Sequence, residues 1–308
     1  MAKSNSHNMK TNWRWQYNGP NRFTLLYFRY LYMVDPNLTH APLGHDVAYP
    51  KTYDPTVLFP IARSGNRQTL SLQPVPAWQG VDIWNAYEMS WLNLKGKPVV
   101  ATACFEFSQS SPNIVESKSF KLYLNSFNES RFDGPDTVLQ RLKQDLSRAS
   151  GAAVHIDMKT VASDADTAYR ALEGINIDDA DLSIERYQPA PELLRCVPDA
   201  PLVNETLMSD LLKTNCPVTG QPDWGSVQIR YSGPQIDRAA LLKYIISLRQ
   251  HNEFHEHCVE RMYCDIWQAC RPESLFVYAR YTRRGGLDIN PWRSSHPTNV
   301  LNQRTIRQ

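Results

Sequence analysis

The sequence predicts an α+β fold in which antiparallel sheets carry helices on one face. The first sign is a hairpin, because apolar and polar residues alternate along Asp82–Leu94 and again along Val99–Ser108, with a Lys-Gly-Lys-Pro turn between them. The second is a helix, since the leucines and the valine of Gly134–Ser150 fall on one stripe. The second half of the chain then repeats this order of elements, so we expect two such α+β units.

The other elements of the first half follow from local periodicity and turn residues. Apolar spacing predicts one helix and two strands, at Glu116–Asn128, Ala153–Val161 and Leu182–Tyr187. Two polar, turn-rich segments, 49–58 and 60–68, should wrap the outside of a domain. The four prolines of Pro189–Pro201 mark a linker.

The second half is predicted from the same signals. A strand, two amphipathic helices and another strand are expected at Gly225–Ser232, Asp237–Arg249, Phe254–Cys270 and Leu275–Tyr281, with a basic, glycine-containing loop at Arg283–Pro291. Two segments of each half can be aligned: Phe105–Ser108 with Ile229–Ser232, and Lys121–Phe127 with Leu242–Leu248. The second alignment keeps a Tyr and a Ser in register, which favours an internal duplication.

We expect the chain to have three parts: an extension over residues 1–42, a first module over 43–188 and a second module over 189–308. Asn12–Tyr32 is basic and aromatic, and it lacks the apolar core and cleavage site of a secretory signal. An interfacial or nucleic-acid-binding arm is one interpretation. The preferred one is an extension that is disordered or precedes the natural start, for which Met33 is the alternative first residue.

Composition argues against several classes of protein. The chain has 308 residues, with 33 Lys and Arg against 31 Asp and Glu, so its formal net charge is only +2. Such a charge argues against a protein held on nucleic acid mainly by electrostatics. No apolar run approaches the length of about 18 residues that a membrane helix needs. The six cysteines form no tight disulfide framework, which predicts reduced thiols in a cytoplasmic protein.

One predicted loop carries a nucleophile and an acid. Two prolines and a glycine interrupt Thr214–Trp224, which contains Cys216 and Asp223. A thiolate attacks electrophilic carbon once it is deprotonated. A carboxyl group held against an aromatic side chain such as Trp224 can act as a proton donor. A surface turn with an incidental cysteine is the alternative.

The second group of interest is Phe254–Cys258, with the sequence Phe-His-Glu-His-Cys, which opens a predicted helix. Its His and Glu could pair for acid–base chemistry or for recognition. With His251 four residues before His255, the histidines could instead bind a metal on one helix face. A solvated helix N-terminus is the plain alternative. Cys258, Cys264 and Cys270 match no zinc spacing, so we predict that they pack in the core.

The third group is Glu116–Lys121, with the sequence Glu-Ser-Lys-Ser-Phe-Lys. An acid that opens a helix is ordinary capping chemistry, which is the default interpretation of Glu116. Basic side chains from both halves could hold a phosphorylated ligand: Lys118, Lys121, Arg280, Arg283 and Arg284. The chain has no GxGxxG fingerprint, so a dinucleotide would not be bound by a Rossmann unit.

Four separated segments, in this order, resemble one known family. They are Glu116–Tyr123, the stretch from Ser209 through Cys216 to Ser226, Phe254–Glu256, and Arg280–Gly286. These segments are similar to the signatures of the QueF family, the NADPH-dependent 7-cyano-7-deazaguanine reductases of queuosine biosynthesis. The resemblance runs from about Leu43 to the end of the chain. Because the signature helix and the cysteine lie in different halves, it corresponds to the long, two-module form.

The resemblance implies a T-fold (tunnel fold) of two tandem ferredoxin-like modules, usually in a homodimer, and a small deazapurine substrate that is reduced by NADPH. No direct nucleic-acid or membrane partner and no metal are implied. The implied catalytic residues are Cys216, which adds to the nitrile carbon, Asp223, which protonates the nitrogen, and His255, which aids proton transfer. The implied substrate-binding residues are Val115, Glu116, Ser117, Phe254, His255 and Glu256. Those implied for NADPH are Ser117, Lys118, Arg284 and Gly285.

Two other functions remain open at this point. A metal-dependent hydrolase on the same fold, similar to GTP cyclohydrolase, would use His251, His255, His257 and a cysteine. A non-catalytic binding or assembly protein would keep the fold alone, but the intact Cys216, Asp223 and His255 argue against it.

Overall fold

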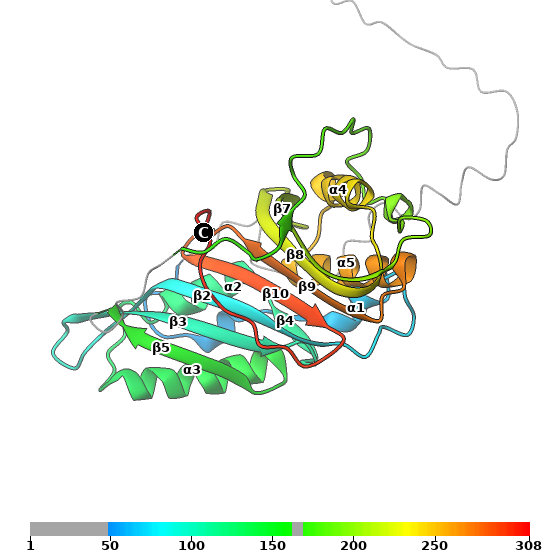
Figure 1. The fold of residues 1–308 in the computed structure, drawn as a ribbon. Coiled ribbons are helices and arrows are strands. Elements are labelled where there is room, and N and C mark those ends of the chain that lie inside the picture. Colours follow the sequence, from blue (N-terminus) through cyan, green and yellow to red (C-terminus); the bar gives the residue numbers. More distant parts are fainter. Residues whose placement is uncertain (1–48, 162–168) are drawn as a thin grey trace, which may run out of the picture. The chain divides into compact units, whose positions relative to one another are not determined.

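The computed structural model describes residues 49–161 and 169–308 (Figure 1). All of these residues lie in one unit, which spans Asn37–Gln308. The predictions for the extension 1–42, including the start at Met33, therefore lie outside the described residues.

An eight-stranded sheet forms the frame of this unit, in the order β5-β3-β2-β10-β9-β8-β7-β6. The strands are β2 (Gln79–Leu92), β3 (Pro98–Ser108), β5 (Val154–Thr160), β6 (Ile175–Asn176), β7 (Leu202–Asn215), β8 (Pro222–Pro234), β9 (Ser274–Tyr281) and β10 (Leu287–Ser294). Neighbouring strands are antiparallel except β6 and β7, which are parallel. A separate antiparallel pair joins β1 (Pro60–Ala62) to β4 (Asn113–Val115). The predicted α+β class is confirmed.

Four longer helices pack against the strands, and a short one precedes the large sheet (Figure 1). They are α1 (Arg63–Arg67), α2 (Ser117–Asn125), α3 (Pro135–Ser150), α4 (Arg238–Ser247) and α5 (His255–Cys270); single 3₁₀ turns lie at Pro55–Val57, Pro191–Leu193 and Leu248–Gln250. Local signals set the ends of α3, which has Pro135 in its first turn and ends at Gly151 with φ of +77°. Helix α3 packs on β5, and α5 packs on β9 and β10.

The two halves repeat side-chain contacts as well as the order of elements. Tyr123 on α2 donates a hydrogen bond to Asp145 Oδ2 on α3 at 2.8 Å, and Tyr244 on α4 donates one to Asp265 Oδ2 on α5 at 2.7 Å. Three residues beyond each tyrosine, a serine hydroxyl donates to that tyrosine's carbonyl oxygen. These are the Tyr and Ser that the sequence alignment placed in register. Such paired contacts support the predicted duplication.

Strand β10 joins what we expected to be two sheets. It follows β9 in the second half but pairs along its whole length with β2 of the first half. Leu287 and Ile289 on β10 enter the core formed by β2, β3, α2 and α3. The prediction of a loop over Arg283–Pro291 is therefore wrong. The basic residues and glycines of this segment prompted it. Pro291 pairs with Asp82 of β2, but the pairing with β9 begins only at Trp292, so the proline lies where that second ladder ends.

Three further boundaries differ from prediction. Leu182–Tyr187 forms no strand, and the short β6 precedes it. Strand β7 was missed because a bulge between Ser209 and Leu212 interrupts its alternation. As a result, the loop predicted over Thr214–Trp224 is shorter: β7 and β8 pair as far as Asn215 and Pro222. Cys216 thus opens a tight hairpin loop rather than lying inside a long one.

Candidate active site

A cavity of about 330 Å³ gathers most of the predicted site residues from both halves of the chain. The cavity is lined by these predicted site residues: Val115, Ser117, Cys216, Asp223, Phe254, His255, Glu256 and Arg284. It is also lined by four residues that were not predicted: Trp84, Pro217, Glu253 and Ile289. Three predicted residues, Glu116, Lys118 and Gly285, are not part of the lining. The cavity lies where α2, the β7–β8 hairpin and the start of α5 meet.

Cys216 is held at the end of β7 by backbone hydrogen bonds on both sides. The Cys216 amide donates to Gln221 O at 2.9 Å and closes the hairpin loop. The preceding residue, Asn215, donates to His251 O at 2.8 Å and accepts from the Glu253 amide at 3.0 Å. The Cys216 side chain is only 2% exposed. The nucleophile candidate is therefore fixed beside the segment that leads into α5, and a surface turn is excluded.

Asp223 faces the cavity from β8, opposite Thr214 in the strand register. Its carboxylate lies 3.4 Å from His255 Nε2 and 3.4 Å from Arg284. Trp224, which we expected to shield this acid, is exposed, because successive strand residues point to opposite faces. That argument for a proton donor is thus wrong. The acid is instead flanked by an imidazole and a guanidinium group.

The first turn of α5 brings His255 and Glu256 into the cavity. The His255 ring stacks on Tyr281, with centroids 3.9 Å apart and planes 25° apart. Glu256 is 3% exposed, and burial followed by the charge of Asp82 raises its pKa above the usual range. A solvated helix N-terminus, the plain alternative, is excluded. This turn offers the cavity an imidazole next to Asp223 and a carboxyl group at a separate position.

Glu116 is the N-cap of α2, as its default interpretation predicted. Its carboxylate accepts hydrogen bonds from the amides of Lys118 at 2.6 Å and Ser119 at 2.7 Å. The side chain is fully buried, and burial raises its pKa despite these bonds. The cap holds the first turn of α2, which places Ser117 in the cavity wall.

Replacing Glu116 with alanine should therefore destabilise the protein. The loss of a cap alone costs about 1 kcal/mol of unfolding free energy. Urea unfolding followed by circular dichroism measures it. Glu129→Ala, at an exposed position beyond the end of the same helix, is the matched control and should leave the midpoint nearly unchanged. Equal midpoints for the two variants would contradict the capping role.

Of the residues predicted to bind NADPH, Ser117 and Arg284 line the cavity, and Gly285 lies beside Lys121 on α2. The turn between β9 and β10 contains Gly285, with φ of +56°, and a Cβ there would lie 1.5 Å from Lys121 Nζ on α2. The preceding residue, Arg284, lines the cavity. Only glycine allows this approach, which brings two cationic side chains of different halves together. Such a cationic edge fits the phosphates of a dinucleotide.

The histidines proposed for a metal contact two carboxylates instead, Glu253 and Asp223. His257 Nδ1 lies 2.8 Å from Glu253, His251 Nε2 lies 3.2 Å from it, and His255 faces Asp223. Burial would raise the pKa of Glu253, but the charge of His257 and these contacts hold it well below its usual value. Across residues 49–161 and 169–308, no group of three or more His, Cys, Asp or Glu is arranged to hold a metal ion.

The remaining cysteines agree with their prediction as core residues. Cys258, Cys264 and Cys270 on α5 are buried, and all six cysteines of the chain are free thiols. Of the helices in the described part of the chain, none combines the length and the apolar character that a membrane span requires.

Comparison with known proteins decides the family. The family model described as "Nitrile reductase, 7-cyano-7-deazaguanine-reductase N-term" matches residues 49–158, and the model described as "QueF-like protein" matches residues 222–299. A protein of Bordetella avium named NADPH-dependent 7-cyano-7-deazaguanine reductase is 60% identical over 258 residues, which cover 84% of this chain and 94% of that protein. The chain belongs to the QueF family of nitrile reductases.

Other QueF relatives with the same printed name come from Bordetella pertussis and Burkholderia vietnamiensis. The first is 56% identical over 276 residues and the second 54% identical over 273 residues; in both cases the match covers 88% of this chain and 100% of the relative. The expected family is thus confirmed over both halves. The shared name specifies NADPH dependence and a cyano-deazaguanine for those relatives.

Proposed function

We propose that the protein uses NADPH to reduce the nitrile of 7-cyano-7-deazaguanine to the aminomethyl group, through a covalent thioimide on Cys216. The observation that carries the proposal is one cavity lined by a free thiol, an acid and an imidazole, in a chain of the QueF family. A nitrile is a poor hydride acceptor. Covalent capture by sulfur divides one difficult reduction into easier steps.

The first step joins the Cys216 sulfur to the nitrile carbon. The Cys216 thiol gives its proton to the neighbouring Asp223–His255 pair as the C–S bond forms, one C–N π bond opens, and the nitrogen takes a proton from Asp223, which yields a neutral thioimide. NADPH, when bound, supplies one hydride to this carbon and a second to the imine that follows. Between the two, the C–S bond breaks and the sulfur leaves with its electron pair. Asp223 and His255, which are 3.4 Å apart, return a proton to the nitrogen after each addition.

The remaining side chains recognise the base and the reductant. Glu256 accepts hydrogen bonds from the base's amide-like donors, Phe254 packs on its ring, and Val115, Glu116 and Ser117 complete the pocket. Glu116 acts there through the α2 turn that it caps. A base without those donors would leave Glu256 buried and unpaired, so it should bind poorly. Lys118, Arg284, Gly285 and Ser117 hold NADPH, and the imine needs a pocket that excludes water.

The proposal extends to the assembly. The two modules, 43–188 and 189–308, form a T-fold, and two copies form a homodimer. Support for the two modules comes from the repeated Tyr–Asp contacts and from two hydrophobic cores, each built mainly from one half. Because β10 of the second module pairs with β2 of the first, both modules are needed for activity. Free cysteines throughout agree with a cytoplasmic enzyme that serves queuosine tRNA modification.

The direct test mixes the protein with 7-cyano-7-deazaguanine and follows the loss of NADPH absorbance. We expect two NADPH consumed for each amine formed, because a nitrile needs four electrons, and no loss without the nitrile. The activity should persist after treatment with a chelator. Absence of NADPH oxidation would defeat the proposal. Stoichiometric zinc with chelator-sensitive hydrolysis of GTP would favour the cyclohydrolase-like alternative.

A further inference from the structure

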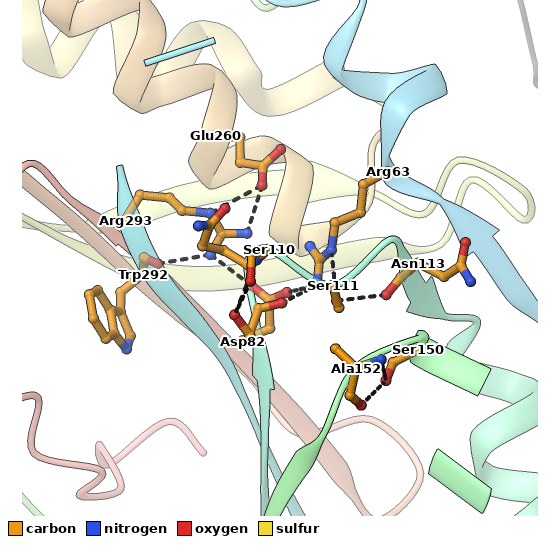
Figure 2. A network of polar contacts seen from close by, with 12 residues as sticks. Arg63, Asp82, Ser110, Ser111, Asn113, Ser150, Ala152, Glu260, Trp292 and Arg293 are labelled. Carbon is orange, nitrogen blue, oxygen red and sulfur yellow. Dashed lines mark hydrogen bonds and ion pairs between the residues drawn. The ribbon is translucent and has the colours of Figure 1, made fainter. Parts of the chain in front are cut away.

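A buried ionic network joins Arg63, Asp82, Glu260 and Arg293 (Figure 2). Arg63 and Glu260 line a second cavity that shares Glu256 with the active cavity. Asp82 on β2 lies 2.6 Å from Arg63 and 2.8 Å from Arg293 on β10. Glu260, one turn beyond Glu256 on α5, lies 2.8 Å from Arg293 and 2.6 Å from Arg67. Two elements of the first half, α1 and β2, and two of the second half, β10 and α5, are thus joined through two carboxylates.

The charges of this network do not cancel. The contacts between described residues contain three guanidinium groups, from Arg63, Arg67 and Arg293, but only two carboxylates, from Asp82 and Glu260. The side chains of Arg63 and Arg293 are 4% and 0% exposed, whereas that of Arg67 is 19% exposed and reaches water. A buried charge without a partner is costly. A third carboxylate nearby would balance the third guanidinium group.

Glu256 is in the position to supply that anion. A second cavity, of about 200 Å³, is lined by Arg63, Asn66, Ile114, Glu256, His257 and Glu260. Glu256 also lines the active cavity, so it forms the wall between the two spaces. With Glu256 ionised, three carboxylates balance three guanidinium groups. Of these guanidinium groups, that of Arg63 shares the second cavity with Glu256.

We propose that Arg63 is a positioning residue that supplies the counter-charge of Glu256 and thereby sets how strongly the site holds the substrate base. This inference rests on the proposed function, in which Glu256 accepts hydrogen bonds from that base. Arg63 does not line the active cavity, so it acts only through Glu256. It belongs to the polar segment 60–68, which we had expected to wrap the outside.

The charged groups that face Glu256 determine the sign of the effect. From α5 these are His255, His257 and Glu260; from the other elements they are Arg63, Asp82, Arg293, Glu253, Asp223 and Arg284. Burial and then Asp82 raise the pKa of Glu256, while His255 and Arg63 lower it. Removing Arg63 should thus raise that pKa further. Substrate binding that needs the Glu256 carboxylate is present above the pKa of Glu256 and is lost as the pH falls through that value. Without Arg63, this loss of binding should therefore occur at a higher pH.

The test measures the dissociation constant of 7-cyano-7-deazaguanine against pH by calorimetry, in a Cys216→Ala background that prevents covalent capture. For Arg63→Met, the pH midpoint below which binding weakens should rise by about one to three units. Arg63→Lys keeps the cation and should stay near the parent. Asp82→Asn removes the anion that opposes ionisation, so its midpoint should fall. Thermal melting confirms that each variant is folded.

Several outcomes would overturn the inference. One is an Arg63→Met midpoint equal to the parent's, and another is an Arg63→Lys midpoint shifted as far as that of Arg63→Met. If Arg63→Met does not fold, a midpoint for Asp82→Asn that fails to drop decides against it. Glu256→Gln separates the two levels of the proposal. Unchanged binding would defeat this inference and the recognition role of Glu256 but not the nitrile reduction, whereas a parent that never binds the nitrile would defeat the proposed function.

Discussion

Cys216→Ala should abolish the nitrile-dependent oxidation of NADPH, with a loss of about a thousandfold or more. The sulfur forms the covalent bond that makes the nitrile carbon reducible, and no other thiol lines the cavity among the described residues. Substrate binding should survive, because the base is held by other side chains. Steady-state rates from NADPH absorbance, with calorimetric binding alongside, measure both effects.

Cys104→Ala is the matched control for this variant. Cys104 is partly buried on β3, and burial raises the pKa of its thiol to about 12, so it is a poor nucleophile. Its replacement should leave the rate close to that of the unaltered protein. A Cys216→Ala protein with a rate near that of Cys104→Ala would show that the reduction needs no covalent intermediate at Cys216.

Asp223→Asn should keep substrate affinity and lose turnover by about a hundredfold to ten-thousandfold, the range for a general acid. The amide has nearly the same shape, but it cannot give the nitrogen a proton while sulfur adds to the carbon. His255 also loses the carboxylate that lies 3.4 Å from its Nε2. Single-turnover experiments with excess enzyme would separate this loss from slow product release.

Asp157→Asn provides the comparison for the acid. Asp157 is an exposed residue on β5, where its carboxylate lies 3.6 Å from Lys159. Its variant should match the unaltered protein in rate and affinity. If Asp223→Asn instead lowered affinity and left the rate of the bound complex unchanged, the acid would be a binding group and another proton donor would be needed.

Local patterns in the sequence predicted most elements of this fold, but they could not predict the pairing between strands of the two halves. The helix over Gly134–Ser150 and the first hairpin have strong periodicity, and both are present. Strand β10 was missed because glycines and basic residues precede it and it contains Pro291, and β7 because a bulge breaks its alternation. Strand β10 pairs along its whole length with β2, a partner distant in sequence that a short window does not contain.

The candidate site also contains residues that sequence patterns predicted and residues that only the structure reveals. Motif residues such as Cys216 and His255 do line one cavity, although the neighbour expected to shield Asp223 lies on the opposite face of β8. Glu253 was not predicted, and its position next to Phe254 was the only signal for it. Arg63 gave no signal at all, because its importance depends on Asp82 and on a cavity shared with Glu256.

The covalent intermediate is the centre of this account, and intact-protein mass spectrometry tests it most directly. The protein is incubated with 7-cyano-7-deazaguanine in the absence of NADPH, so that the thioimide accumulates. We predict a single adduct with the mass of one whole substrate molecule, because addition to a nitrile releases no leaving group, and no adduct on Cys216→Ala. An unmodified wild-type protein that still reduces the nitrile, or an adduct that persists on Cys216→Ala, would contradict the account.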